Sequence, residues 1–130
     1  MKIIVAGGRD FNNYDIMDKV LSNYIGSSND IIVSGDARGA DTLGARWGQF
    51  NHLVVKHFPA DWDYYGHAAG FIRNIEMAEY ADMLIAFWDG KSKGTAHMIK
   101  TAKRNGLPYY VFNYSGEEIE RGWIDETSSN

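Results

Sequence analysis

The chain has 130 residues, of which 45% are hydrophobic, and its formal net charge is −4. This length and composition predict one globular domain with a substantial core, and the acidic balance argues against broad nonspecific binding of nucleic acid while leaving a local basic site open. The absence of cysteine excludes disulfides, thiolate zinc sites and cysteine nucleophiles, and the absence of any long apolar run predicts a cytoplasmic protein with no membrane partner.

Five apolar runs rich in β-formers recur along the chain and predict five strands. They begin at Lys2, Asp30, His52, Asp82 and Pro108, and they read KIIVAG, DIIVSG, HLVVKHF, DMLIAFW and PYYVFNY. Several runs are apolar on both faces, which is typical of parallel strands covered by helices on both sides.

Between these runs, apolar residues recur at helical spacing. The expected helices span residues 13–25, 40–50, 68–80 and 95–105. Strands that alternate with helices predict an α/β fold, namely a Rossmann-like, doubly wound three-layer sandwich with a mainly parallel sheet of about five strands over residues 1–114. Residues 115–130 are polar and are expected to form a C-terminal tail that is frayed or partly docked through Trp123 and Ile124.

Unusual residues concentrate in the loops that follow the first four strands. These loops read AGGRDF, SGDARGAD, FPADWDYYGHAAG and FWDGKSKGT, whereas turns on the opposite side, such as RNGLP, are plain. In a doubly wound fold the carboxyl ends of the strands meet at one edge of the sheet, where ligands bind. The asymmetry therefore predicts a binding site at that edge.

The first of these loops offers an arginine to an anion. Gly7 and Gly8 permit a tight turn and a close backbone approach. Arg9 follows directly, and an anionic ligand is a natural partner for it. The alternative interpretation is a local ion pair between Arg9 and Asp10.

The second loop offers another arginine. Arg38 is a candidate ligand for an anion, or a surface charge paired with Asp36 or Asp41. Asp41 or Thr42 is expected to act as the N-cap of the helix that follows, since these side chains accept hydrogen bonds from free amides.

The loop GKSKGT, residues 90–95, precedes a helix whose first amides are able to hold a phosphate. Its order and spacing exclude a Walker A motif, and no GxGxxG follows the first strand, so an ordinary dinucleotide dehydrogenase is disfavoured. The alternative is a solvated loop.

Aromatic residues are dense after the third strand. Trp62, Tyr64 and Tyr65 are candidates to stack on a base, or to close the core or a dimer contact. Arg73 and Asn74 lie in the next helix, and either point back to the site or face solvent.

Other chemistries receive little support. The four histidines show no metal-ligand spacing, and no GxSxG elbow is present. His67 and His97 fall near the predicted edge of the sheet and are candidates to contact a ligand. Hydrolysis by two carboxylates stays open, because five aspartates fall on the unusual loops, namely Asp10, Asp36, Asp61, Asp63 and Asp89.

Four segments in order carry a resemblance to a known family. They read GGRDF, SGDARGADTLGARW, FPADWDYYGHAAGFIRN and FWDGKSKGTAHMI, and extend from about Gly7 to Met98. The chain resembles the YspA-type, YpsA-related group of the SLOG superfamily, which includes the DNA-processing protein DprA and the LOG-type phosphoribohydrolases of nucleoside monophosphates. The resemblance implies a Rossmann-like SLOG domain that binds a nucleotide or nucleotide-derived ligand, in a bacterial or phage protein.

The resemblance also implies which residues contact the ligand. They are Gly8, Arg9, Ser34, Gly35, Arg38, Gly39, Asp41, Arg73, Asn74, Asp89, Gly90, Ser92, Gly94 and Thr95. The stacking argument adds Trp62. LOG-type enzymes carry a catalytic glutamate after the Gly-Thr pair, whereas Ala96 and His97 follow Thr95 here, so Glu76 and Asp89 are the candidates to replace it.

Three functions follow from these observations. The first is a binding module that senses or sequesters a nucleotide-derived small molecule, without a cofactor or metal. The alternative is a LOG-like hydrolase of the N-glycosidic bond of a nucleoside monophosphate. The second alternative is DprA-like binding of single-stranded DNA, against which the acidic balance argues. The LOG-type relatives and the spare aromatic residues suggest a homodimer.

Overall fold

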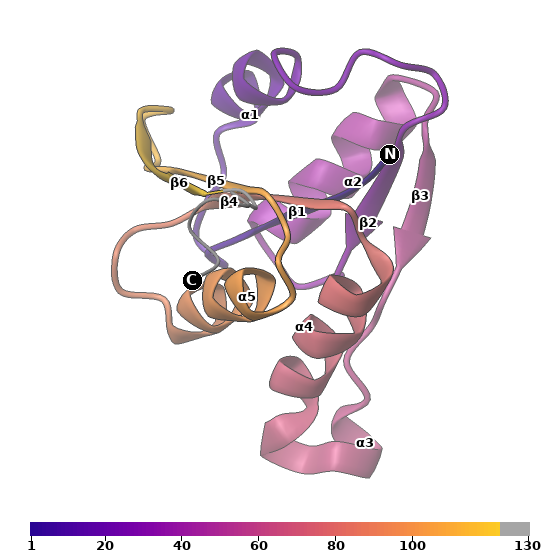
Figure 1. The fold of residues 1–130 in the computed structure, drawn as a ribbon, viewed down its shortest axis with the longest axis vertical. Helices are drawn as coiled ribbons and strands as arrows, with labels where there is room; N and C mark the ends of the chain where they lie inside the picture. The colour runs from indigo at the N-terminus through magenta and orange to yellow at the C-terminus, as the bar shows by residue number, and fades with distance from the viewer. Residues whose placement is uncertain (123–130) are drawn as a thin grey trace.

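The computed structural model of the chain describes residues 1–122, in which strands and helices alternate (Figure 1). The elements are β1 (Lys2–Gly7), α1 (Tyr14–Leu21), β2 (Ile31–Ser34), α2 (Ala40–Phe50), β3 (Val54–His57), α3 (Trp62–Tyr65), the short 3₁₀ helix η1 (Gly66–Ala68), α4 (Ala69–Tyr80), β4 (Met83–Phe87), α5 (Lys93–Arg104), β5 (Tyr109–Phe112) and β6 (Glu118–Gly122).

The strands form one sheet in the order β3-β2-β1-β4-β5-β6. The first five strands of the chain run parallel, and β6 pairs antiparallel with β5. The predicted α/β architecture with a mainly parallel sheet is therefore confirmed, with six strands where about five were expected.

The sixth strand comes from the segment expected to be a polar tail. A turn brings β6 back along β5, and the backbone N–H of Asn113 donates to the carbonyl oxygen of Glu117 at 2.8 Å. Tyr109 then donates its hydroxyl to Glu120 at 2.9 Å across the pair. The strand reads EIERG and carries little apolar signal, because it is an edge strand with polar faces. Trp123 and Ile124 lie outside the described residues.

Helices cover both faces of the sheet. On one face α1 and α2 pack on a core that includes Ile3 and Val5 of β1, whereas on the other face α4 and α5 pack on a core that includes Ile4 and Ala6 (Figure 1). Alternate residues of the same strand thus enter different cores, which explains the uninterrupted apolar run of β1.

Several helix boundaries differ from the prediction, and α5 begins at Lys93 rather than at residue 95. The helix expected over residues 13–25 ends at Leu21, because Ile25 reaches the core from a turn and so continues the apolar spacing without being helical. The helix expected over 68–80 is preceded by α3 and η1, and Asp61 caps α3 by accepting from the backbone N–H of Tyr64 at 3.1 Å.

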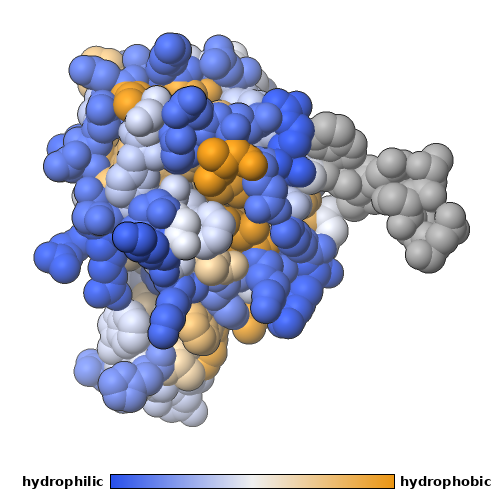
Figure 2. Space-filling view, turned by 90° about the vertical axis from the view of Figure 1, so that its left-hand side faces the viewer, coloured by the Kyte–Doolittle hydropathy of each residue, from blue (hydrophilic) through white to orange (hydrophobic). Residues whose placement is uncertain are grey.

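The α3 segment and the start of α4 project from the rest of the molecule (Figure 1). The projection carries exposed aromatic side chains, including Tyr64, which is 79% exposed. The side of the molecule seen in Figure 2 is otherwise mostly hydrophilic, with a small hydrophobic area at its centre. The homodimer stays a prediction. Every helix of residues 1–122 is too short or too polar to cross a membrane.

The strand order places β1 between β2 and β4. From β1 the chain proceeds to β2 and β3 on one side, and it then crosses to β4 and β5 on the other. The loops that leave the carboxyl ends of β1 and β4 therefore diverge and open a crevice, which is where ligands bind in doubly wound folds.

Candidate functional site

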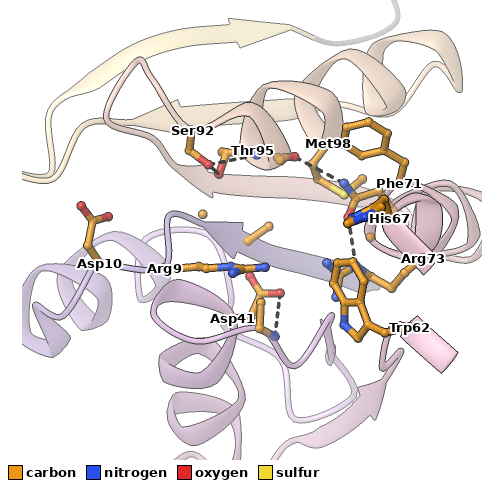
Figure 3. Close-up of a pocket in the computed structure, with 16 residues that line it drawn as sticks. Arg9, Asp10, Asp41, Trp62, His67, Phe71, Arg73, Ser92, Thr95 and Met98 are labelled. Atoms are coloured by element: carbon orange, nitrogen blue, oxygen red, sulfur yellow. Dashed lines mark hydrogen bonds between the residues drawn. The ribbon is translucent and has the colours of Figure 1, made fainter. Parts of the chain in front are cut away.

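A cavity of about 410 Å³, the switch-point cavity, lies at the carboxyl ends of β1 and β4 (Figure 3). Its lining residues come from the end of β1 and the loop after it, from the loop after β2 and the start of α2, from α3 and η1, and from the N-terminal halves of α4 and α5. They are Ala6, Gly7, Arg9, Asp10, Ala37, Asp41, Trp62, His67, Gly70, Phe71, Arg73, Asn74, Ser92, Gly94, Thr95 and Met98.

A second cavity of about 290 Å³, the Arg38 cavity, lies beside the first. It is lined by Arg9, Gly35, Asp36, Ala37, Arg38, Pro59, Ala60, Trp62 and Arg73. Four residues line both cavities, namely Arg9, Ala37, Trp62 and Arg73. The loops after β1, β2, β3 and β4 thus converge as the sequence predicted.

The loop after β4 shapes the N-terminus of α5. Ser92 caps the helix, because its Oγ accepts from the backbone N–H of Thr95 at 3.3 Å. Asp89 orders the turn before it by accepting from the backbone N–H groups of Lys91 and Ser92, both at 2.8 Å, and these bonds hold the pKa of the Asp89 carboxyl below its usual value. The amides of Lys93 and Gly94 have no intrahelical acceptor, and a Cβ at Gly94 would meet no protein atom within 4 Å.

Arg9 extends into the switch-point cavity, with Asp41 on one side and Ser92 and Thr95 on the other (Figure 3). Among residues 1–122 its guanidinium takes part in no salt bridge or hydrogen bond. The predicted alternative, an ion pair with Asp10, is therefore absent, because Asp10 accepts a 2.5 Å hydrogen bond from the hydroxyl of Tyr114 instead.

The loop of Arg9 is held against the start of α2. Gly39 has a φ of 81°, and a Cβ there would overlap the backbone of Gly8 and Arg9. The backbone N–H of Ala40 donates to the carbonyl oxygen of Gly8 at 3.2 Å. Glycine at position 39 is thus required both by the left-handed backbone and by this close approach.

Asp41 lies at the floor of the cavity and is 4% exposed. Its carboxylate accepts from the backbone N–H of Ala37 at 3.4 Å. Burial raises the pKa of Asp41 from its usual 3.8 to about 6, against the opposing effects of the Arg73 charge and of backbone N–H groups. A carboxyl of this kind exchanges its proton near neutral pH.

The expectation that Asp41 or Thr42 caps α2 is wrong. The N-cap is Gly39, which makes no side-chain hydrogen bond, and Asp41 already lies inside the first turn. The hydroxyl of Thr42 donates to the carbonyl oxygen of Ala37 at 2.8 Å, so both side chains order the loop before the helix rather than the helix amides.

Arg73 and Asn74 point into the site rather than to solvent. Arg73 donates through Nη1 to the carbonyl oxygen of Gly35 and through Nε to Oδ1 of Asn74 at 3.1 Å. Asn74 is 5% exposed and donates through Nδ2 to the carbonyl oxygen of Gly94 at 3.3 Å. These bonds fix the guanidinium of Arg73 at the boundary of the two cavities.

Trp62 stands on α3 at the far end of the switch-point cavity (Figure 3). Its side chain is 49% exposed and lines both cavities. Tyr64 and Tyr65 pack edge to face on each other, with ring centroids 4.7 Å apart, and line neither. The structure thus separates one ring that lines both cavities from two that line neither.

Several residues implied by the resemblance do not line either cavity. Ser34 is buried, and its hydroxyl donates to the carbonyl oxygen of Asp41 at 3.0 Å. Gly8 packs beneath Tyr114. Asp89 and Gly90 lie on the exposed side of the loop after β4, and Glu76 lies on the exposed side of α4. Both candidate catalytic carboxylates are therefore outside the cavities.

Other lining residues were not among the predicted ligand contacts. In the switch-point cavity they are Asp10, Gly70, Phe71 and Met98, together with Ala6, Gly7 and Ala37. Met98 could have been found, because it follows Thr95 by three residues on the same helix. His67 was a candidate because of its place near this edge of the sheet, and the structure places it in the lining. Phe71 was not recognised, because an apolar residue in the helix expected over 68–80 is more often part of a core. Among residues 1–122 no cluster of three or more histidine and acidic side chains suits a metal ion.

The fold and the cavity define a Rossmann-like α/β protein with a ligand site at the switch point of its sheet. The model of the YspA, cpYpsA-related SLOG family matches residues 1–65, which is half of the chain. The chain therefore belongs to this SLOG family, as the motifs indicated.

A relative and two solved structures are also similar. The Gene 61 protein of Mycobacterium phage D29 is 40% identical in an alignment of 89 residues that covers 63% of this chain and 70% of that protein. The fold is similar to that of DprA from Streptococcus pneumoniae, with a TM-score of 0.67 and 21% identity over 86% of this chain. It is also similar to DprA from Helicobacter pylori, with a TM-score of 0.60 and 18% identity over 86% of this chain.

The relative and the two solved structures support different conclusions. The chain spans 49% of the S. pneumoniae structure and 65% of the H. pylori one, and at these identities the likeness shows the fold alone. The phage relative fits the expected bacterial or phage origin. The H. pylori structure is described by its single-stranded DNA binding mode, which is a property of that protein.

Proposed function

We propose that the switch-point cavity binds a nucleotide or nucleotide-derived ligand through its phosphate. The observation that carries the proposal is the guanidinium of Arg9, which extends without a carboxylate partner into a cavity that also receives the N-terminus of α5. Free amides at a helix N-terminus and an arginine fork both favour a phosphate.

The rest of the cavity suits the rest of a nucleotide. Trp62 offers an indole face at the far end, and stacking of a base on an aromatic ring contributes about 1–3 kcal/mol. Asp10 and Asp41 offer carboxylate oxygens that accept hydrogen bonds from ribose hydroxyls. A volume of about 410 Å³ is in the usual range for small-ligand sites.

A binding module is favoured over an enzyme because Glu76 and Asp89 lie outside both cavities. One observation keeps hydrolysis of an N-glycosidic bond as a second candidate. Asp41 lines the cavity, and its pKa of about 6 suits proton transfer near neutral pH. Incubation with nucleoside monophosphates and chromatography of the products separates the two functions, because only the hydrolase releases free base.

The proposal is tested by calorimetric titration with the four ribonucleoside 5′-monophosphates. We expect at least one to bind, and Arg9→Ala to weaken it about tenfold to hundredfold, as for the loss of a charge-assisted hydrogen bond. Arg46→Ala removes an exposed arginine of α2 that lines neither cavity and should leave the affinity unchanged. Equal affinities of Arg9→Ala and the wild-type protein would contradict the proposal.

A further inference from the structure

The Arg38 cavity holds a positive charge that a mononucleotide in the neighbouring cavity leaves unused. Arg38 is exposed, and among residues 1–122 its guanidinium has no hydrogen bond or salt bridge. Asp36 lines the same cavity, but its carboxylate is engaged by Nδ1 of His57 at 2.7 Å and lies 3.4 Å from the Ser34 hydroxyl. The negative charge of Asp36 is thus directed to the β2–β3 side of the loop.

The wall between the two cavities contains groups that bind nucleotides. Arg9, Arg73 and Trp62 line both sides of it. Arg73 uses Nη1 and Nε for protein acceptors, which holds its guanidinium in place, and no described carboxylate forms a salt bridge with it. Two guanidinium groups beside one indole suit a base flanked by phosphates.

The loop that carries Arg38 is ordered before any ligand arrives. The backbone of the preceding residue, Ala37, is held at both ends, since its N–H donates to Asp41 at 3.4 Å and its carbonyl oxygen accepts from Thr42 at 2.8 Å. Gly39, which follows, is fixed against the backbone of Arg9. An arginine on an ordered loop loses less entropy on binding than one on a mobile loop.

We propose that the natural ligand carries two separate phosphate groups, one held at the N-terminus of α5 with Arg9 and the other held by Arg38. The class is a nucleoside bisphosphate or a phosphodiester-linked dinucleotide unit, either free or as part of a single strand. This inference rests on the proposed function, and it adds the second phosphate and the residue that binds it.

The test is calorimetric titration of the wild-type protein and of three variants with matched ligands. The ligands are the ribonucleoside 5′-monophosphate that binds best, its 3′,5′-bisphosphate and its 5′-phosphorylated dinucleotide. The wild-type protein and Arg46→Ala should bind a two-phosphate ligand at least about tenfold more tightly than the monophosphate, as for one added charge-assisted contact. In Arg38→Ala this ratio should fall to near one, and in Arg38→Lys it should be partly retained.

Three outcomes overturn the inference. Equal affinities of the wild-type protein for the one-phosphate and two-phosphate ligands would remove the second site, and an unchanged ratio in Arg38→Ala would remove Arg38 from it; either result would leave the proposed function standing. Failure of every nucleotide to bind would refute both. A single-stranded oligothymidylate of about ten nucleotides then distinguishes the sources. If the oligothymidylate binds more tightly than the dinucleotide, and this binding depends on Arg38, the natural ligand is a strand. If the oligothymidylate binds more weakly, the natural ligand is a free nucleotide.

Discussion

Nδ2 of Asn74 donates to the carbonyl oxygen of Gly94 at 3.3 Å, so a buried amide of α4 is bonded to the first turn of α5. The other end of the same amide accepts from Nε of Arg73 at 3.1 Å. Asn74 therefore joins the phosphate end of the switch-point cavity to the guanidinium at its boundary with the Arg38 cavity. It is a positioning residue rather than a ligand contact alone.

Asn74→Ala should destabilise the fold and weaken nucleotide binding together. The substitution leaves Nε of Arg73 without its acceptor and removes the hydrogen bond that ties α4 to the carbonyl oxygen of Gly94. The loss of a buried hydrogen-bond partner costs about 1–3 kcal/mol. Urea unfolding and calorimetry measure the two effects. Glu76→Ala on the exposed side of the same helix is the control, with a change within about 0.5 kcal/mol. A binding loss without a stability loss would assign Asn74 to the ligand only.

Trp62→Ala should lower the affinity for a nucleotide about tenfold or more while leaving stability nearly unchanged. The ring is half exposed and reaches the ligand space of both cavities, so its removal costs the stacking contact, about 1–3 kcal/mol. Trp62→Phe should retain much of the affinity. Tyr64→Ala, three-quarters exposed on the same projection, should bind normally. Equal losses in Trp62→Ala and Tyr64→Ala would point to a general effect on α3.

The raised pKa of Asp41 predicts a specific dependence of the free energy of unfolding on pH. Burial raises its pKa in the folded protein to about 6 from its usual 3.8, so the folded state holds a proton that the unfolded state has released in this window. Its contribution to stability is therefore present at low pH and is lost as the pH rises through about 6. From about pH 4.5 to 7 the loss from this group is about 2 kcal/mol.

Asp41→Asn should abolish that part of the pH dependence. Urea unfolding of the wild-type protein and of the variant at about pH 4.5 and about pH 7 isolates this contribution. The comparison uses the change in stability between the two pH values, so the stability of the variant at a single pH does not affect it. Asp63→Asn, an exposed carboxylate on α3, is the control and should keep the wild-type slope. Parallel pH profiles for the wild-type protein and Asp41→Asn would show that Asp41 titrates normally.

Gly8→Ala should destabilise the loop after β1, because a Cβ at Gly8 would overlap the phenol oxygen of Tyr114. The overlap displaces the ring and breaks its 2.5 Å hydrogen bond to Asp10. Removing the hydroxyl by Tyr114→Phe should relieve part of the clash. A double-mutant cycle of unfolding free energies should therefore give a coupling of about 1 kcal/mol or more, whereas additive effects would place the cost of Gly8→Ala elsewhere.

Most of the fold follows from local pattern in the sequence. The runs of β1 and β4 are apolar on both faces because each strand serves two cores. Alternation with helices then fixes the carboxyl edge as the place where loops meet. β6 was missed because its residues are polar on an edge strand. α3 was missed because its boundaries depend on a cap at Asp61 rather than on apolar spacing.

The site is predictable in position but not in detail. Topology alone gathers Arg9, Trp62 and Ser92 at one edge of the sheet. The sequence does not say that Arg38 lines a second cavity, since that depends on the direction of a loop fixed by Gly39. Nor does it separate Asp41, which is buried at the floor, from Asp89, which orders a turn outside both cavities.

The central claim is that the N-terminus of α5, Arg9 and Trp62 hold one nucleotide together. It is tested most directly by ¹H–¹⁵N NMR titration of the wild-type protein with the best-binding ribonucleoside 5′-monophosphate. The largest shift changes should fall on the backbone amides of Lys93 and Gly94 and on the indole N–H of Trp62, with the same dissociation constant for all three. Changes that leave these signals in place and fall on the outer face of α2, around Arg46, would contradict the account.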